Sequence, residues 1–144
     1  MSGSNRELDV PANAAQHQAE PRTAFRQEIA TVELLRSQCA SAINDHDFEA
    51  VQHIAKDAAE HWLAARAACR RLIEGTKELS PYALAARTVL ESNYIALLGL
   101  FAHAAKTIAV PGMRQKLEQA RATIMAANEQ ALLVAPVATR AKRE

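Results

Sequence analysis

The longest regular pattern in this sequence runs over residues 48–79, FEAVQHIAKDAAEHWLAARAACRRLIEGTKEL. Small or apolar side chains, with one threonine among them, recur at alternating steps of three and four residues: Phe48, Val51, Ala55, Ala58, Trp62, Ala65, Cys69, Leu72, Thr76 and Leu79. Only an α-helix gathers that spacing onto one face. Because several members are alanine or cysteine, we expect a long helix whose face, the first seam, lies close against a neighbour.

The last quarter of the chain repeats this alternation in a second seam: Met113, Leu117, Ala120, Ile124, Ala127, Ala131 and Val134. Two such stripes in one chain indicate paired helices. The larger side chains of both seams are the expected helix-pairing residues: Phe48, Val51, Trp62, Leu72, Met113, Leu117, Ile124 and Val134.

Composition agrees with an all-helical protein. The chain has 144 residues, which is enough for one domain, and 49% of them are hydrophobic while only 4% are aromatic. Four glycines and five prolines leave few breaks for a β-sheet protein. We therefore predict an all-α fold, an elongated bundle or coiled-coil-like arrangement of about four amphipathic helices.

Prolines and polar breaks set the expected boundaries. Thr23 can cap a first helix, Asn44 and the following aspartates interrupt it, and Ser80-Pro81 has the pattern of a new helix start. The expected order is a disordered arm over residues 1–22, helices over residues 23–44, 48–79, 81–109 and 113–135, and a frayed basic tail over residues 139–144, with residues 23–138 as one domain.

Charge and hydropathy exclude some classes of partner. The 17 basic and 16 acidic residues are interspersed and leave a net charge of +1, so we expect no nucleic-acid binding. The start has no pattern of a secretory signal, which favours the cytoplasm. The longest nearly apolar stretch, residues 94–105, is shorter than the roughly 20 residues of a spanning helix, so no transmembrane segment is expected.

The third expected helix has an unusually wide apolar arc. Leu90, Tyr94, Leu97, Phe101 and Ile108 share one stripe, and Ile95, Leu98 and Leu100 lie beside it. Such an arc fits the centre of a bundle, a contact between protomers or a foreign apolar surface, and periodicity does not separate the three.

The best candidates for chemistry lie on the second helix: His46, Glu49, His53, Asp57, Glu60 and His61. Of these, His46, Glu49, His53 and Glu60 project away from the first seam, and the chain has no Glu-x-x-His motif of the kind that di-metal bundles use, so we expect a solvated charged face with no metal and no cofactor. A metal-binding bundle using His53, Asp57 and His61 is the least favoured alternative.

The chain also lacks a nucleophile elbow and a phosphate-binding glycine loop, so we predict no enzyme activity. Cys39 and Cys69 fall on apolar faces and are expected to be buried, reduced thiols.

Three short motifs carry a family resemblance: Gly75-Thr76-Lys77-Glu78-Leu79, Asn93 within Glu91-Ser92-Asn93-Tyr94, and Ala105-Lys106-Thr107-Ile108, with Gln115 and Arg121 following in the last helix. Over residues 48–140 this run resembles the phasins, coat proteins of bacterial polyhydroxyalkanoate granules. The resemblance implies a non-catalytic amphipathic protein that adsorbs to the polyester and controls granule surface and size. It implies that the polymer meets Leu90, Tyr94, Ile95, Leu97, Leu98, Phe101 and Ile108.

The expected partners are therefore the granule surface and further copies of the chain in a homo-oligomer. The main alternative is a helical protein-interaction or chaperone-like module that pairs through the seam of Trp62 as a homo-oligomer.

Overall fold

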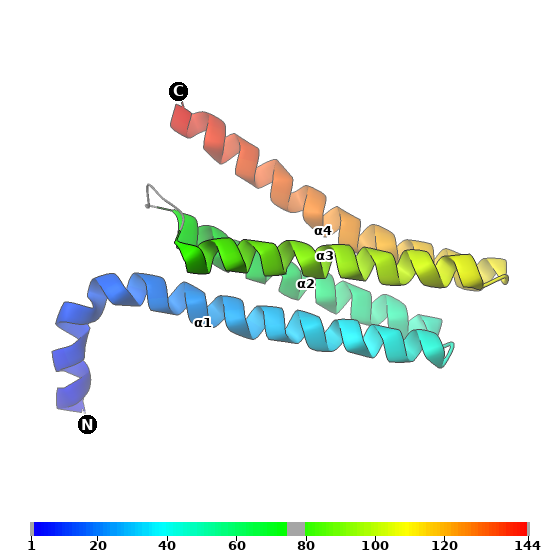
Figure 1. Cartoon of the computed structure of the whole chain (residues 1–144), viewed down its shortest axis with the longest axis horizontal. Coiled ribbons are helices and arrows are strands. Elements are labelled where there is room, and N and C mark those ends of the chain that lie inside the picture. The colour runs from blue at the N-terminus through cyan, green and yellow to red at the C-terminus, as the bar shows by residue number, and fades with distance from the viewer. Residues whose placement is uncertain (1, 75–79, 144) are drawn as a thin grey trace.

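The computed structural model describes the backbone of residues 2–74 and 80–143 and the side chains of residues 20–74 and 80–131. Over these ranges the chain is all-α, as predicted, with helices α1 (Ser2–Asn44), α2 (Phe48–Ile73), α3 (Pro81–Thr107) and α4 (Pro111–Arg143). Figure 1 shows an elongated bundle in which successive helices run in opposite directions.

Helix α2 is the centre of the bundle because it makes the most extensive contacts with the other helices, above all with α1 and α4. α1 lies mainly on α2, α3 lies mainly on α4, and α2 and α4 pack beside each other as parallel neighbours (Figure 1). α1 touches α3 sparingly, and it does not reach α4 within the described ranges. The fold is thus two helical hairpins, α1–α2 and α3–α4, joined chiefly through α2 and α4.

Side-chain caps start the two central helices. The Asp47 carboxylate accepts a hydrogen bond from the Ala50 backbone N–H at 3.2 Å, and the Ser80 hydroxyl accepts one from the Ala83 N–H at 3.1 Å. Each cap satisfies a backbone donor that has no partner within its helix. Both starts confirm the sequence prediction. Between α1 and α2, His46 adopts a positive φ of 60°, which lets the chain reverse direction.

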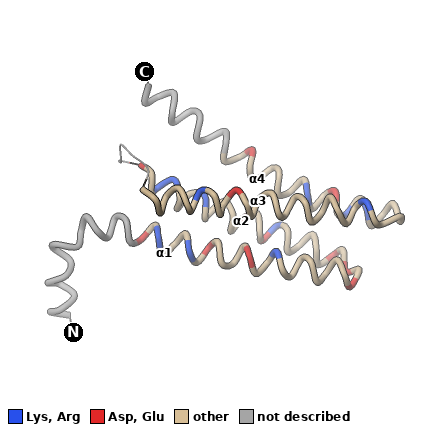
Figure 2. Tube along the Cα trace, in the orientation of Figure 1, with Lys and Arg blue, Asp and Glu red and all other residues tan. Residues whose placement is uncertain are grey.

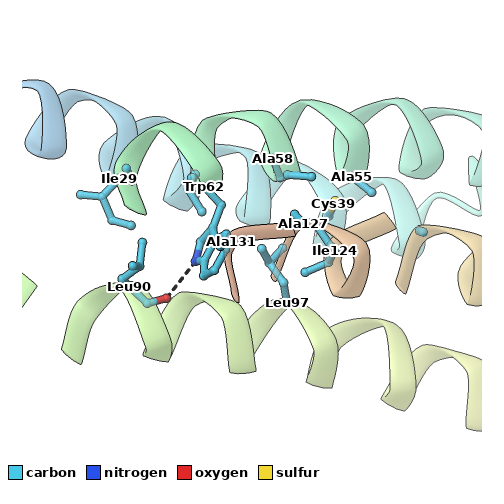
Figure 3. Close-up of a cluster of buried hydrophobic side chains, with 14 of the residues drawn as sticks. Ile29, Cys39, Ala55, Ala58, Trp62, Leu90, Leu97, Ile124, Ala127 and Ala131 are labelled. Atoms are coloured by element: carbon cyan, nitrogen blue, oxygen red, sulfur yellow. Dashed lines mark hydrogen bonds between the residues drawn. The ribbon is translucent and has the colours of Figure 1, made fainter. Parts of the chain in front are cut away.

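The core consists of the two predicted seams and one face each of α1 and α3. Every described member of the first seam is buried, and so is the second seam from Leu117 to Ala131, while Met113 is half-buried. Many of these side chains are small, and Figure 3 shows alanines of α2 and α4 in the same cluster as Leu97 and Ile124. Alanine at a contact lets helix backbones approach closely, so the interior is thin but continuous.

The expected length of the second helix is wrong. α2 ends at Ile73, where Glu74 turns to extended backbone and its N–H donates to the Arg70 carbonyl. Its 26 residues span about 39 Å, against roughly 50 Å for a helix reaching Leu79. A glycine directly after Glu74 disfavours continuation of the helix. Thr76 and Leu79 of the first seam lie outside the described residues.

Two boundaries that rested on proline also differ. α1 begins at Ser2 rather than Thr23 and so includes residues 2–22 of the predicted arm, and α4 continues past Pro136 to Arg143, which places most of the predicted frayed tail inside a helix. A proline removes one backbone hydrogen bond, but it does not by itself end a helix whose other bonds remain. The Pro21 ring is fully buried, which offsets that loss. The side chain of Val134 lies outside the described residues.

Candidate functional site

The apolar arc predicted on the third helix divides into an inner and an outer face of α3. Leu90, Leu97 and Phe101 have at most 1% of their surface exposed and belong to the core, so the implication that they meet polymer is wrong for the folded bundle. They belong to the stripe that the spacing marks, and this stripe faces the other helices, whereas the resemblance assigns the whole arc to one polymer-facing surface. Tyr94, Leu98 and Ile108 are half-buried at the edge of this core.

The outer face of α3 is exposed and carries few charges. Ile95 is 67% exposed and Leu84 is 44% exposed. No lysine, arginine, aspartate or glutamate occurs between Glu91 and Lys106, and Figure 2 shows this run in tan along α3. We call the following side chains, which recur at steps of three and four residues and are exposed except for the half-buried Leu98 and Ala102, the outer stripe: Leu84, Thr88, Glu91, Ile95, Leu98, Ala102 and Lys106. It is the described surface that best fits an apolar partner.

The inner face of α3 is held to α2 by the indole of Trp62. Its Nε1–H donates to the Leu90 backbone carbonyl at 3.0 Å, a buried hydrogen bond drawn as the dashed line in Figure 3. The ring centroids of Trp62 and Tyr94 lie 5.5 Å apart, and the Arg66 guanidinium lies 5.8 Å from the indole centroid. An aromatic group with a satisfied polar atom therefore fixes α3 at mid-length.

A polar contact joins α3 to α1 where the two helices otherwise pack sparingly. Asn93 is 2% exposed; its amide N–H groups donate to the Val89 carbonyl at 3.0 Å and to Glu33 at 3.4 Å, and its amide oxygen accepts from Arg36 at 3.0 Å. An amide on the otherwise apolar stripe of Leu90 and Leu97 is the sequence signal for this role. Our sequence analysis placed Asn93 only within a family motif and missed it.

Next to Asn93, a hollow of about 390 Å³ opens between α1 and α3, lined by Glu33, Arg36, Ser37, Ala40, Ala96 and Leu100. Near the start of α3, the Tyr82 ring lies 4.6 Å from the Arg22 guanidinium and 5.9 Å from that of Arg26. The α1–α3 boundary therefore carries charged side chains next to Asn93 and Tyr82, whereas the outer stripe is uncharged between Glu91 and Lys106.

The charged side chains of α2 face solvent, as predicted. The exposed residues of this set are His46, Glu49, His53, Asp57 and Glu60. His61 is half-buried, and its Nδ1 lies 2.5 Å from the Oε1 of Glu28 on α1. Glu49 pairs with Lys116 of α4, which lowers the pKa of this carboxyl below its ordinary value. The described residues contain no group of three or more His, Cys, Asp or Glu side chains placed to hold a metal ion. His53, Asp57 and His61 do not converge on one point.

Both cysteines are free thiols buried in the bundle, which confirms the prediction for Cys39 and Cys69. Burial raises the pKa of Cys39 to about 12 and also raises that of Cys69. At neutral pH neither thiol forms the thiolate that nucleophilic chemistry needs.

The remaining residues of the three short motifs, and the two residues that follow them, lie at the end of α3 or on α4 where these are described. Lys106 and Thr107 are exposed at the end of α3, Gln115 is exposed on α4 and Arg121 is half-buried there, while residues 75–79 lie outside the described ranges.

In the described part of the chain, no helix is long and apolar enough to span a bilayer. No family model matches the chain, and neither a curated protein nor a solved structure matches it.

Proposed function

We propose that this protein is a non-catalytic coat that adsorbs to polyhydroxyalkanoate storage granules in the bacterial cytoplasm and controls their surface and size. The observation that carries the proposal is the outer stripe of α3, an exposed helix face with Ile95 at its centre and no charge between Glu91 and Lys106. The solvated charges of α2 would then face water and keep coated granules apart.

The size of this surface predicts weak adsorption of each molecule. Full burial of one isoleucine or leucine side chain contributes roughly 1.5–3 kcal/mol, and Ile95 and Leu84 are only partly exposed in the free protein. Burying both against a polyester contributes about 3 kcal/mol per molecule. Such a coat would be reversible and dense, and its coverage would follow the free protein concentration.

Co-sedimentation with amorphous polyhydroxybutyrate particles tests the proposal, with inert hydrophobic beads of equal area as the comparison surface. The variant is Ile95→Lys, which places a charge in the stripe and keeps the helix, because Glu91 lies one turn earlier. The matched control is Leu34→Lys, at a side chain on α1 that is 58% exposed and lies outside the stripe.

We expect saturable binding of the wild type that prefers the polyester to the beads, several-fold weaker binding of Ile95→Lys, and unchanged binding of Leu34→Lys. Absence of binding, equal binding to both surfaces, or equal loss in the two variants would each overturn the proposal.

The alternative is a helical protein-interaction or chaperone-like module, which the sequence analysis expects to pair through the seam of Trp62. That seam is buried inside the bundle, so a protein partner would have to use an exposed apolar helix face such as the outer stripe. Homo-oligomer formation belongs to both proposals.

A further inference from the structure

From Glu91 to Lys106, the outer stripe of α3 together with the neighbouring exposed Gly99 has a two-fold pattern centred between Leu98 and Gly99. Reading outward from that centre in both directions, Leu98 matches Gly99, Ile95 matches Ala102, and Glu91 matches Lys106. At 1.5 Å per residue, Glu91 and Lys106 lie about 11 Å on either side of the centre. Each large side chain thus has a small counterpart, and the acidic end has a basic one.

The centre of the pattern is open. A Cβ atom built on Gly99 meets no heavy atom of the described residues within 4 Å, and Gly99 is exposed. Glycine and alanine at a helix contact allow two helix backbones to come close, as the alanines of α2 and α4 do within the bundle. A helix that crosses at Gly99 would therefore place its own Leu98 and Ile95 over the small residues.

The two charges at the ends of the run are available. Within the described residues, Glu91 and Lys106 are both exposed and form no ion pair. In an antiparallel pair of α3 helices, Glu91 of each copy would lie opposite Lys106 of the other, so two ion pairs would close the contact. A parallel pair would instead bring Glu91 against Glu91 and Lys106 against Lys106.

We propose that two copies of this chain associate through the outer stripe of α3, antiparallel about a two-fold axis near Leu98 and Gly99. The interface is isologous, because one self-complementary patch serves both copies. The inference rests on the proposed function in one respect, since the dimer buries the surface that would meet the polymer. Dimerisation and adsorption are then mutually exclusive, and the dimer is a soluble store from which the granule draws monomers.

Charge exchange at the ends of the stripe tests this arrangement. Glu91→Lys gives like charges at both contacts of an antiparallel dimer, and so does Lys106→Glu, whereas the double variant restores opposite charges. An equimolar mixture of the two single variants also restores them in a heterodimer. Glu60→Lys, at an exposed residue of α2, is the matched control for the change of charge.

Analytical ultracentrifugation from micromolar to millimolar protein measures the association, and circular dichroism checks helix content. We expect the wild type and Glu60→Lys to approach twice the chain mass of 15.7 kDa. Each single variant should dimerise about tenfold more weakly at low salt, because two exposed ion pairs become two repulsions. The double variant and the mixture should recover the wild-type constant.

A wild type that stays monomeric throughout, or single variants that associate as tightly as the wild type, would overturn the inference. These outcomes are separate from those of the adsorption assay. A monomeric protein that binds polyester refutes only the dimer, and a charge-sensitive dimer that binds no polyester refutes only the granule-coat function.

Discussion

Leu97 and Ile95 allow the two faces of α3 to be compared by nearly the same change. Leu97→Ala removes a side chain that has no exposed surface and contacts the core, whereas Ile95→Ala removes one that is 67% exposed. Truncation of a buried leucine costs about 2–5 kcal/mol, as lost transfer energy and a residual cavity. For Ile95 we expect a change within about 0.5 kcal/mol, because little burial is lost and alanine is the better helix former.

Urea unfolding followed by circular dichroism gives both free energies, and polyester co-sedimentation at a temperature where both variants are folded gives the functional readout. Leu97→Ala should lose stability and keep adsorption, and Ile95→Ala should show the reverse. If Leu97→Ala costs less than about 1 kcal/mol, its side chain is not in a packed core and the division of α3 into two faces is wrong.

Two further predictions concern contacts between helices. Trp62→Phe should lower the free energy of unfolding by about 2–3 kcal/mol in urea titration, because the hydrogen bond to the Leu90 carbonyl and part of the ring volume are lost; an unchanged value would contradict that contact. Glu49→Gln should lower the melting temperature at neutral pH. The folded-state pKa of Glu49 lies below its ordinary 4.5, so its pair with Lys116 contributes stability above that pH and loses it as pH falls through the folded pKa. The two melting temperatures should therefore converge in acid.

Sequence periodicity predicted α2 and α4 well because each has a single apolar stripe. When polar side chains such as His53 and Glu60 occupy the opposite face, the buried side of a helix follows from spacing alone. The caps at Asp47 and Ser80 were predictable for a similar reason, since a side chain and a backbone donor a few residues apart form a local contact.

Helix α3 shows where that reasoning stops. Its apolar arc is wide, so the resemblance assigns Leu97 on the stripe and Ile95 beside it to the same polymer-facing surface, although one is core and the other is exposed. Their difference depends on which side α2 and α4 occupy, and that is a tertiary fact. Asn93 likewise joins α3 to α1 through Glu33 and Arg36, which lie far away in sequence but contact it directly in the fold.

The contact between Trp62 and α3 also provides the protein with its own optical probe. Trp62 is the sole tryptophan of the chain, and its ring is 2% exposed beneath Leu90. Its fluorescence therefore reports directly on whether α3 stays on α2. A partner bound only to the outer stripe leaves the indole dry and its emission at short wavelength, whereas a surface that lifts α3 from the bundle wets the ring and shifts the emission to the red.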